Sequence, residues 1–171
     1  YAYAPTIAEF VDDAYSRCDT KLILGNEHLI SARRSLNFLF SDWANDGVYL
    51  FAVDEQTQTL TTDLASYTAA TGTLYILDGI IRRSGVDTPV VKMSREQYHA
   101  IPNKTSNGLP SQVYFDRRTL IYYLWNEPEN STDVFRYFRL RRIQDVLTAA
   151  ETPDIPYRFN EALAAGLAAK L

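Results

Sequence analysis

The chain has 171 residues, a formal net charge of −4 and a hydrophobic fraction of 46%. This length suits one folding unit rather than several, and the hydrophobic fraction is too high for a disordered chain. The single cysteine excludes an internal disulfide and a cysteine-rich metal site. The acidic balance gives no general attraction to nucleic acid. The 22 aromatic side chains indicate a packed core, extensive interfaces or both.

Residues 1–47 are predicted to be helical. Thr6 and Glu9 have the spacing of a capping box. An apolar stripe from Ile7 to Cys18 then predicts a helix of about 12 residues in which the Cys18 thiol is buried. A longer helix is expected from near Asn26 to Asp46, and the two helices are expected to pack antiparallel.

Residues 48–150 have the Thr-, Val-, Ile- and Tyr-rich composition of β strands. One short helix is expected near 94–100, where Ser94 can cap it. Tight turns are expected at 85–87 and 116–118, and an exposed loop at 101–110. The predicted strands cover residues 49–53, 56–61, 65–69, 74–82, 89–93, 111–116, 119–126 and 133–142.

A last helix is predicted within residues 151–171, beginning near 154–156. The expected fold class is therefore α+β. The N-terminal helix pair and the C-terminal helix form a small bundle, and an antiparallel β region is inserted between them in one folding unit. The chain begins without methionine and its last helix has no stop signal, so we expect short segments beyond both ends. The longest uncharged run, 64–77, is too short and polar for a membrane span, and no membrane partner is expected.

No motif predicts catalysis, a metal site or a cofactor. The seven glycines are isolated, which excludes a phosphate-binding loop, and the two histidines lack partners at ligand spacing. Two carboxylate pairs remain, Glu127 with Glu129 and Asp54 with Glu55. A solvated turn is the favoured interpretation, and the acids of a glycosidase are the alternative.

Arginines occur in four doublets, and the predicted strand 133–142 is the most basic segment. Arg139 and Arg141 are expected on one face of this strand. The aromatic residues between the arginines would suit a nucleic-acid platform. The abundance of neighbouring acids instead favours salt bridges between subunits.

Four segments, taken in order, resemble one protein family. They are Ser35–Gly47 followed by Leu50–Glu55; Ser94–Tyr98 followed by Ile101–Thr105, Gly108 and Pro110; Leu124-Trp125 with Pro128; and Ile155–Phe159 followed by Ala162-Leu163 and Gly166–Ala168. In these segments the chain resembles the head-to-tail adaptors of short-tailed phages, also called tail accessory factors or packaged-DNA stabilisation proteins. Two positions depart from the family pattern. Asp63 stands where relatives often carry a turn glycine, and Asn126-Glu127 replaces a Trp-Pro step.

The resemblance implies a virion structural protein with no enzymatic activity and no cofactor. Family members form a twelve-fold ring beneath the portal, which extends the DNA channel, retains packaged DNA and supports the tail nozzle or tail tube. The implied partners are the portal protein, the tail nozzle or tail tube protein, further copies of the chain, and DNA that passes without sequence-specific binding. The implied location is the head–tail junction of a virion assembled in the host cytoplasm.

A ring of identical subunits needs two different contact surfaces on each subunit. Tyrosine, tryptophan and arginine suit such contacts, and a channel lining poor in Lys and Arg would let DNA slide. The loop 102–110 is expected to contact a neighbouring ring. The candidate interface residues are Tyr98, Lys104, Asn107, Arg117, Trp125, Arg139, Arg141, Tyr157 and Arg158. The alternative function is a cell-wall-cleaving or glycan-binding virion protein that uses one of the two carboxylate pairs.

Overall fold

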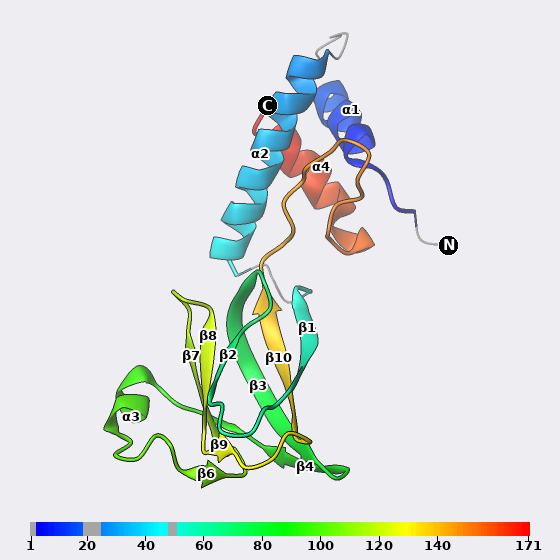
Figure 1. Ribbon diagram of the computed structural model, residues 1–171. Coiled ribbons are helices and arrows are strands. Elements are labelled where there is room, and N and C mark those ends of the chain that lie inside the picture. The colour runs from blue at the N-terminus through cyan, green and yellow to red at the C-terminus, as the bar shows by residue number, and fades with distance from the viewer. Residues whose placement is uncertain (1–2, 19–24, 48–50) are drawn as a thin grey trace. The chain divides into compact units, whose positions relative to one another are not determined.

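The computed structural model describes residues 3–18, 25–47 and 51–171 (Figure 1). The chain divides into two compact units. The helical unit comprises Tyr1–Phe51 and Ile143–Leu171, and the β unit comprises Ala52–Arg142. The predicted α+β class with antiparallel sheets is confirmed.

The helical unit contains α1 (Ile7–Arg17), α2 (Asn26–Asn45), the short 3-10 helix η1 (Tyr157–Phe159) and α4 (Asn160–Ala168). The predicted capping box of α1 is confirmed. The Thr6 backbone N–H donates to Glu9 Oε2 at 2.6 Å, and the Glu9 backbone N–H donates to Thr6 Oγ1 at 3.4 Å. These two bonds satisfy N–H groups that the first helical turn would otherwise leave without partners.

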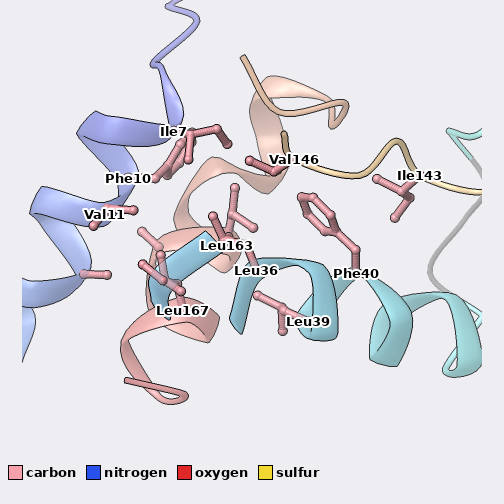
Figure 2. Close-up of a cluster of buried hydrophobic side chains, with 13 residues drawn as sticks. Ile7, Phe10, Val11, Leu36, Leu39, Phe40, Ile143, Val146, Leu163 and Leu167 are labelled. Atoms are coloured by element: carbon pink, nitrogen blue, oxygen red, sulfur yellow. The ribbon is translucent and has the colours of Figure 1, made fainter. Parts of the chain in front are cut away.

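The three α-helices of this unit share one hydrophobic core, and Figure 2 shows their apolar side chains converging. Each fully buried Leu, Ile or Phe side chain contributes about 1.5–3 kcal/mol to folding. A Cβ at Gly166 in α4 would lie 3.0 Å from Leu39 Cδ2 in α2, so a residue without a side chain permits this close packing. The buried members are Ile7, Phe10, Val11, Ala14, Ala32, Leu36, Leu39, Phe40, Ile143, Val146, Leu163, Ala164 and Leu167.

The β unit contains two four-stranded sheets and one two-stranded pair. The first sheet has the order β1 (Val53–Thr59), β10 (Val134–Arg141), β3 (Thr73–Arg83), β4 (Val86–Pro89), and every neighbouring pair is antiparallel. The second has the order β2 (Ser66–Thr68), β8 (Ile121–Trp125), β7 (Gln112–Asp116), β5 (Val91–Lys92), and only β5 with β7 is parallel. A parallel pair joins β6 (Asn107–Gly108) to β9 (Glu127–Pro128), and α3 (Arg95–Ala100) lies between β5 and β6 in the chain.

A second hydrophobic core lies within the β unit, and aromatic rings dominate it. Tyr122 lies 5.6 Å from Tyr67, 5.4 Å from Phe135 and 5.5 Å from Tyr137 between ring centroids. Four of the 22 aromatic side chains are therefore buried in this core. Phe135 and Tyr137 are buried, so neither ring can stack on a nucleic-acid base.

Three predictions in the β unit are wrong. The strand expected at 89–93 does not form as one strand, because β4 ends at Pro89 in the first sheet and β5 covers only Val91–Lys92 in the second. One strand, β1, occupies 53–59 where the sequence predicts two strands at 49–53 and 56–61; residues 49 and 50 lie outside the described residues. The turn expected at 85–87 consists of Ser84 and Gly85, with φ of 50° and 82°. A two-residue hairpin turn of this kind needs positive φ at both positions, which leaves Val86 and Asp87 free to form β4.

The predicted burial of Cys18 is also wrong, because this thiol is exposed. Cys18 is the C-cap of α1, so it lies where the helix ends rather than on its packed face. Its Sγ donates a weak hydrogen bond to the Ala168 carbonyl at 3.4 Å. The buried apolar face of α1 therefore ends at Ala14, one turn before Cys18, where the apolar pattern of the sequence ends.

Candidate functional site

Four of the candidate interface residues belong to one region of the β unit, the α3 face. This region comprises α3, the loop 101–110 and the ends of β8 and β9, and it contains Tyr98, Lys104, Asn107 and Trp125. Ser94 caps α3 as the sequence predicts, and its Oγ accepts from the Gln97 backbone N–H at 3.2 Å. This cap fixes the start of a helix that has only six residues.

Tyr98 on α3 lies on a tyrosine stack that the two neighbouring strands supply. Its ring centroid is 5.2 Å from Tyr114 on β7 and 5.2 Å from Tyr123 on β8, and these two rings lie 5.9 Å apart. Lys104 Nζ donates to the Ile101 carbonyl at 3.0 Å and lies 5.4 Å from the Tyr98 ring centroid. Burial is the main reason why the pKa of Tyr98 lies above its usual value.

Tyr114 and Tyr123 are not among the predicted site residues, although the sequence contains a signal for them. The predicted strands 111–116 and 119–126 form a hairpin about a short turn. In the structure, Tyr114 is directly opposite Tyr123 in the β7–β8 ladder. Two aromatic residues at opposite positions of one hairpin pack against each other on one face.

The loop 101–110 is held to the rest of the β unit at several points. Trp125 Nε1 donates to the Asn103 carbonyl at 3.0 Å. Asn107 pairs with Glu127 in the β6–β9 ladder, and its Nδ2 donates to Asp63 Oδ1 at 2.6 Å. The expected exposed loop is therefore anchored by the side chains of Trp125 and Asp63 and by the backbone of β9.

Asp63, where the resembling family pattern has a turn glycine, has a φ of 60°. This is the left-handed region, where glycine has no steric penalty and Asp is among the better tolerated alternatives. The Asp63 backbone N–H donates to the Pro128 carbonyl at 3.0 Å. The aspartate therefore keeps a turn that suits glycine, and its carboxylate adds the bond to Asn107.

A groove of about 460 Å³ lies between α3, β5 and the start of the loop. Its lining is mostly apolar, with Val91, Met93, Ile101 and Pro102 among its members, and the Trp125 side chain closes one part of it. The α3 face thus combines stacked aromatic rings with a hollow, which are features of protein contact surfaces.

Arg117 lies elsewhere on the β unit, in the turn between β7 and β8. Its guanidinium carbon is 4.4 Å from the Tyr75 ring centroid, and Lys92 Nζ is 5.1 Å from the same centroid. Two cations therefore flank one aromatic ring. The sequence gives no signal for this cluster, because its three residues come from three strands or turns far apart in the chain.

Arg139 does not lie on the surface, because its side chain is buried at 7% exposure. Nε donates to Asp54 Oδ1 at 2.6 Å, and Nη1 donates to Thr73 Oγ1 at 2.9 Å and to the Ala70 carbonyl at 3.0 Å. Arg141 approaches the same carboxylate, with Nε 3.8 Å from Asp54 Oδ2. The Arg139 guanidinium therefore joins β1 to the turn before β3 and leaves little of itself for another molecule.

Other arginines of the β unit also find their acidic partners within the chain. Arg82 bonds Asp87 at 2.6 Å, and Arg136 bonds Glu55 at 2.6 Å. Arg83 bonds the fully buried Asp133 at 2.6 Å. Arginine–acid pairs that the sequence analysis assigns to neighbouring subunits are thus intramolecular here.

Three of the four carboxylates of the alternative hydrolase interpretation serve as partners of arginines. Glu129 bonds Arg83. Asp54 and Glu55 are consecutive in β1, where successive side chains point to opposite faces of the sheet, and they bind Arg139 and Arg136 respectively. Asp54 and Glu55 therefore cannot flank one glycosidic bond.

Tyr157 and Arg158 lie in η1 of the helical unit, apart from the α3 face. Tyr157 is 73% exposed, and the Arg158 guanidinium carbon lies 5.6 Å from the Phe159 ring centroid. The predicted interface residues are thus divided between the two units. The structure brings together those of the α3 face and, around Asp54, Arg139 and Arg141.

The described residues contain no group of three or more His, Cys, Asp or Glu side chains that could hold a metal ion. Of the helices in the described ranges, none has the length and apolar character needed to cross a membrane. Models of known protein families match no part of the chain, and no curated protein matches it.

Proposed function

We propose that this chain is a phage head-to-tail adaptor. In this role, twelve copies form a ring beneath the portal at the head–tail junction. The ring extends the DNA channel, retains packaged DNA and carries the tail nozzle or tail tube. The proposal includes the finer architecture, a bundle of N- and C-terminal helices with an antiparallel β region inserted between them, and it assigns the protein no catalytic activity.

The observation that carries the proposal is that the four resembling segments meet in two pairs, one pair within each unit. Leu36, Leu39 and Phe40 of the first segment share a core with Leu163 and Leu167 of the fourth. A resemblance spread along the sequence by chance has no reason to converge in this way.

The second and third segments also meet each other, in the β unit. Trp125 of the third segment bonds the Asn103 carbonyl of the second at 3.0 Å, and Gly108 pairs with Pro128 in the β6–β9 ladder. The residues that resemble the family are therefore the ones that build the helical core and the α3 face.

The α3 face supports a docking role toward the portal or the tail. It carries exposed loop residues on a frame that Trp125, Lys104 and Asn107 hold in place. A contact surface that is ordered before binding loses less conformational entropy when a partner arrives.

The proposal is tested by mixing the full-length protein with isolated portal rings and measuring the mass of the complex by native mass spectrometry. We expect twelve copies on each portal ring. A protein that stays unbound, or that binds in a number unrelated to the portal symmetry, contradicts the proposal.

A charged side chain placed on the exposed loop tests the α3 face. Pro102→Glu introduces a charge into the groove lining without removing an anchoring hydrogen bond. We expect weaker attachment to the portal or to the tail protein with unchanged thermal stability. Leu147→Glu, at an exposed position of the helical unit, is the matched control in this assay. If the Pro102 variant attaches fully to both partners, the α3 face is not the docking surface.

A further inference from the structure

The first sheet of the β unit ends in two edges of different character. Its order β1-β10-β3-β4 places β1 at one edge and β4 at the other. Within the described part of the chain, β10 is the only strand that pairs with β1 (Figure 1). A strand edge with free backbone groups is a template for pairing with another chain.

Two backbone hydrogen bonds at the ends of β1 establish which of its backbone groups face outward. The Arg141 N–H donates to the Ala52 carbonyl at 2.8 Å, and the Leu60 N–H donates to the Asp133 carbonyl at 2.9 Å. Even-numbered residues from 52 to 60 therefore face β10, since backbone groups alternate along an antiparallel strand. The residues whose backbone N–H and carbonyl groups face away from β10 are Val53, Glu55, Thr57 and Thr59.

This outward edge lacks the usual protection against pairing. Natural edge strands are blocked by proline, by lysine or other charged side chains, by a bulge or by very short length. The two charged residues of β1, Asp54 and Glu55, are both neutralised by arginines of β10. The strand β1 has seven residues, contains no proline or lysine, and pairs with β10 in one continuous register. One outward group is already used, because the Thr59 carbonyl accepts a bond from Gln58 Nε2 at 2.8 Å.

The opposite edge, β4, has only four residues and ends in Pro89, so it carries two of these protections and can pair over a short length only. It still presents backbone groups. The two-residue turn at Ser84-Gly85 makes Arg83 and Val86 a hydrogen-bonded pair. Asp87 and Pro89 therefore face outward. Asp87 offers an N–H and a carbonyl, whereas Pro89 offers only a carbonyl.

We propose that β4 of one copy adds to the outward edge of β1 in a second copy, so that the first sheet continues from subunit to subunit. Every pair within the sheet is antiparallel, and a β4–β1 contact continues that alternation. The two surfaces differ and lie on opposite sides of one sheet, which is the arrangement that a head-to-tail ring needs. As the contact of a ring, the inference rests on the proposed function.

The charges at the two edges permit this contact. The outward-facing acid of β4, Asp87, is already paired with Arg82 at 2.6 Å, and Glu55 of β1 is paired with Arg136 at 2.6 Å. Neither edge therefore presents an unpaired carboxylate to the other. Val86, which is 66% exposed, would gain apolar contact beside β1.

Disulfide trapping tests the contact directly. In the register that places Asp87 of one copy opposite Thr57 of the next, Val86 faces Gln58. These two residues form the closer type of antiparallel pair, with Cα atoms about 4.5 Å apart. Gln58→Cys with Val86→Cys, in a Cys18→Ser chain, should give a ladder of dimers, trimers and larger species on oxidation.

An intrachain disulfide between these two positions is not possible. The strands β1 and β4 are three strand spacings apart in one sheet, about 14 Å, and a disulfide requires Cα atoms within about 7 Å. Every disulfide between the two positions must therefore join two chains. A chain that traps no ladder at high protein concentration overturns the inference.

A proline substitution provides the second test. In the double-cysteine chain, Thr57→Pro removes an outward N–H and blocks the edge without removing a β1–β10 hydrogen bond. It should abolish the ladder, whereas Thr57→Val, which keeps the N–H, should leave the ladder unchanged. A ladder that survives Thr57→Pro also overturns the inference.

Single-cysteine chains identify the competing contacts. If Gln58→Cys alone gives as much dimer as the pair, two β1 edges associate symmetrically and the proposed contact is wrong. If the full chain docks on the portal in twelve copies but traps no ladder, the edge contact fails and the proposed function stands. If the ladder forms but the chain does not dock on the portal, the edge contact stands and the proposed function fails.

Discussion

Tyr122 is the residue with the least satisfied environment in the β unit. Its side chain is fully buried, and its hydroxyl has no hydrogen-bond partner among the described residues. Burial raises the pKa of this hydroxyl well above its usual value of 10.0. A buried polar group without a partner costs about 1–3 kcal/mol.

Tyr122→Phe should therefore raise the free energy of unfolding by about 1 kcal/mol, because it removes an unpaired hydroxyl and keeps the packed ring. Urea unfolding measures the change. Tyr67→Phe is the matched control on the neighbouring ring: its hydroxyl accepts from the Thr61 N–H at 2.9 Å. That control should lower stability. A Tyr122 variant as destabilised as the Tyr67 variant would show that the Tyr122 hydroxyl has a partner.

Asp54 gives the β unit a pH-dependent contribution to stability. The hydrogen bond from Arg139 is the main reason why the pKa of Asp54 lies below its usual value of 3.8. A carboxyl whose folded-state pKa is depressed stabilises the fold above its unfolded-state pKa, and this contribution disappears as pH falls through the folded-state value. The wild-type protein should therefore lose this contribution below about pH 4.

Asp54→Asn should lower the free energy of unfolding at pH 7 by about 1.5–3 kcal/mol, the value of a hydrogen bond to a charged group. The deficit should shrink as pH falls from about 5 to about 2, because the wild-type carboxyl is then protonated. Urea midpoints measured across this pH range give the difference curve. Glu161→Gln is the control in the helical unit. The Glu161 carboxyl also accepts a hydrogen bond from an arginine, Arg17, which lowers its pKa. A deficit that is constant with pH would mean that the Asp54–Arg139 bond contributes nothing through charge.

At the scale of single elements, the sequence predicts local structure well where the signal is local. The capping box at Thr6 and the helix cap at Ser94 depend on residues only three positions apart, and both predictions are confirmed. The hairpin that pairs 112–116 with 121–125 is also predictable from the sequence, since its two strands and its turn are contiguous.

Elements that depend on long-range pairing were not predictable in the same way. The strands β6 and β9 have two residues each and exist because Asn107-Gly108 meets Glu127-Pro128. Arg139 shows the same limit for a single side chain. Its place in the most basic predicted strand favours a surface role, whereas Asp54, Thr73 and the Ala70 carbonyl bind it inside the β unit.

At the scale of the whole molecule, the two hydrophobic cores are separate. The helical core and the aromatic core of the β unit share no member. The sequence analysis expects one folding unit, because a chain of this length needs no more than one. Two cores within such a chain raise the question of whether they unfold together.

Two separate cores predict that damage to one leaves the other protected. Leu163→Ala removes a fully buried side chain from the helical core and should cost that unit about 2–5 kcal/mol. Native-state hydrogen exchange should then show faster exchange in α1, α2 and α4 and unchanged exchange in β3 and β10. Ile81→Ala, in the aromatic core, is the reciprocal variant and should reverse the pattern. Exchange that accelerates equally in both units for both variants would show one cooperative unit, as the chain length alone suggests.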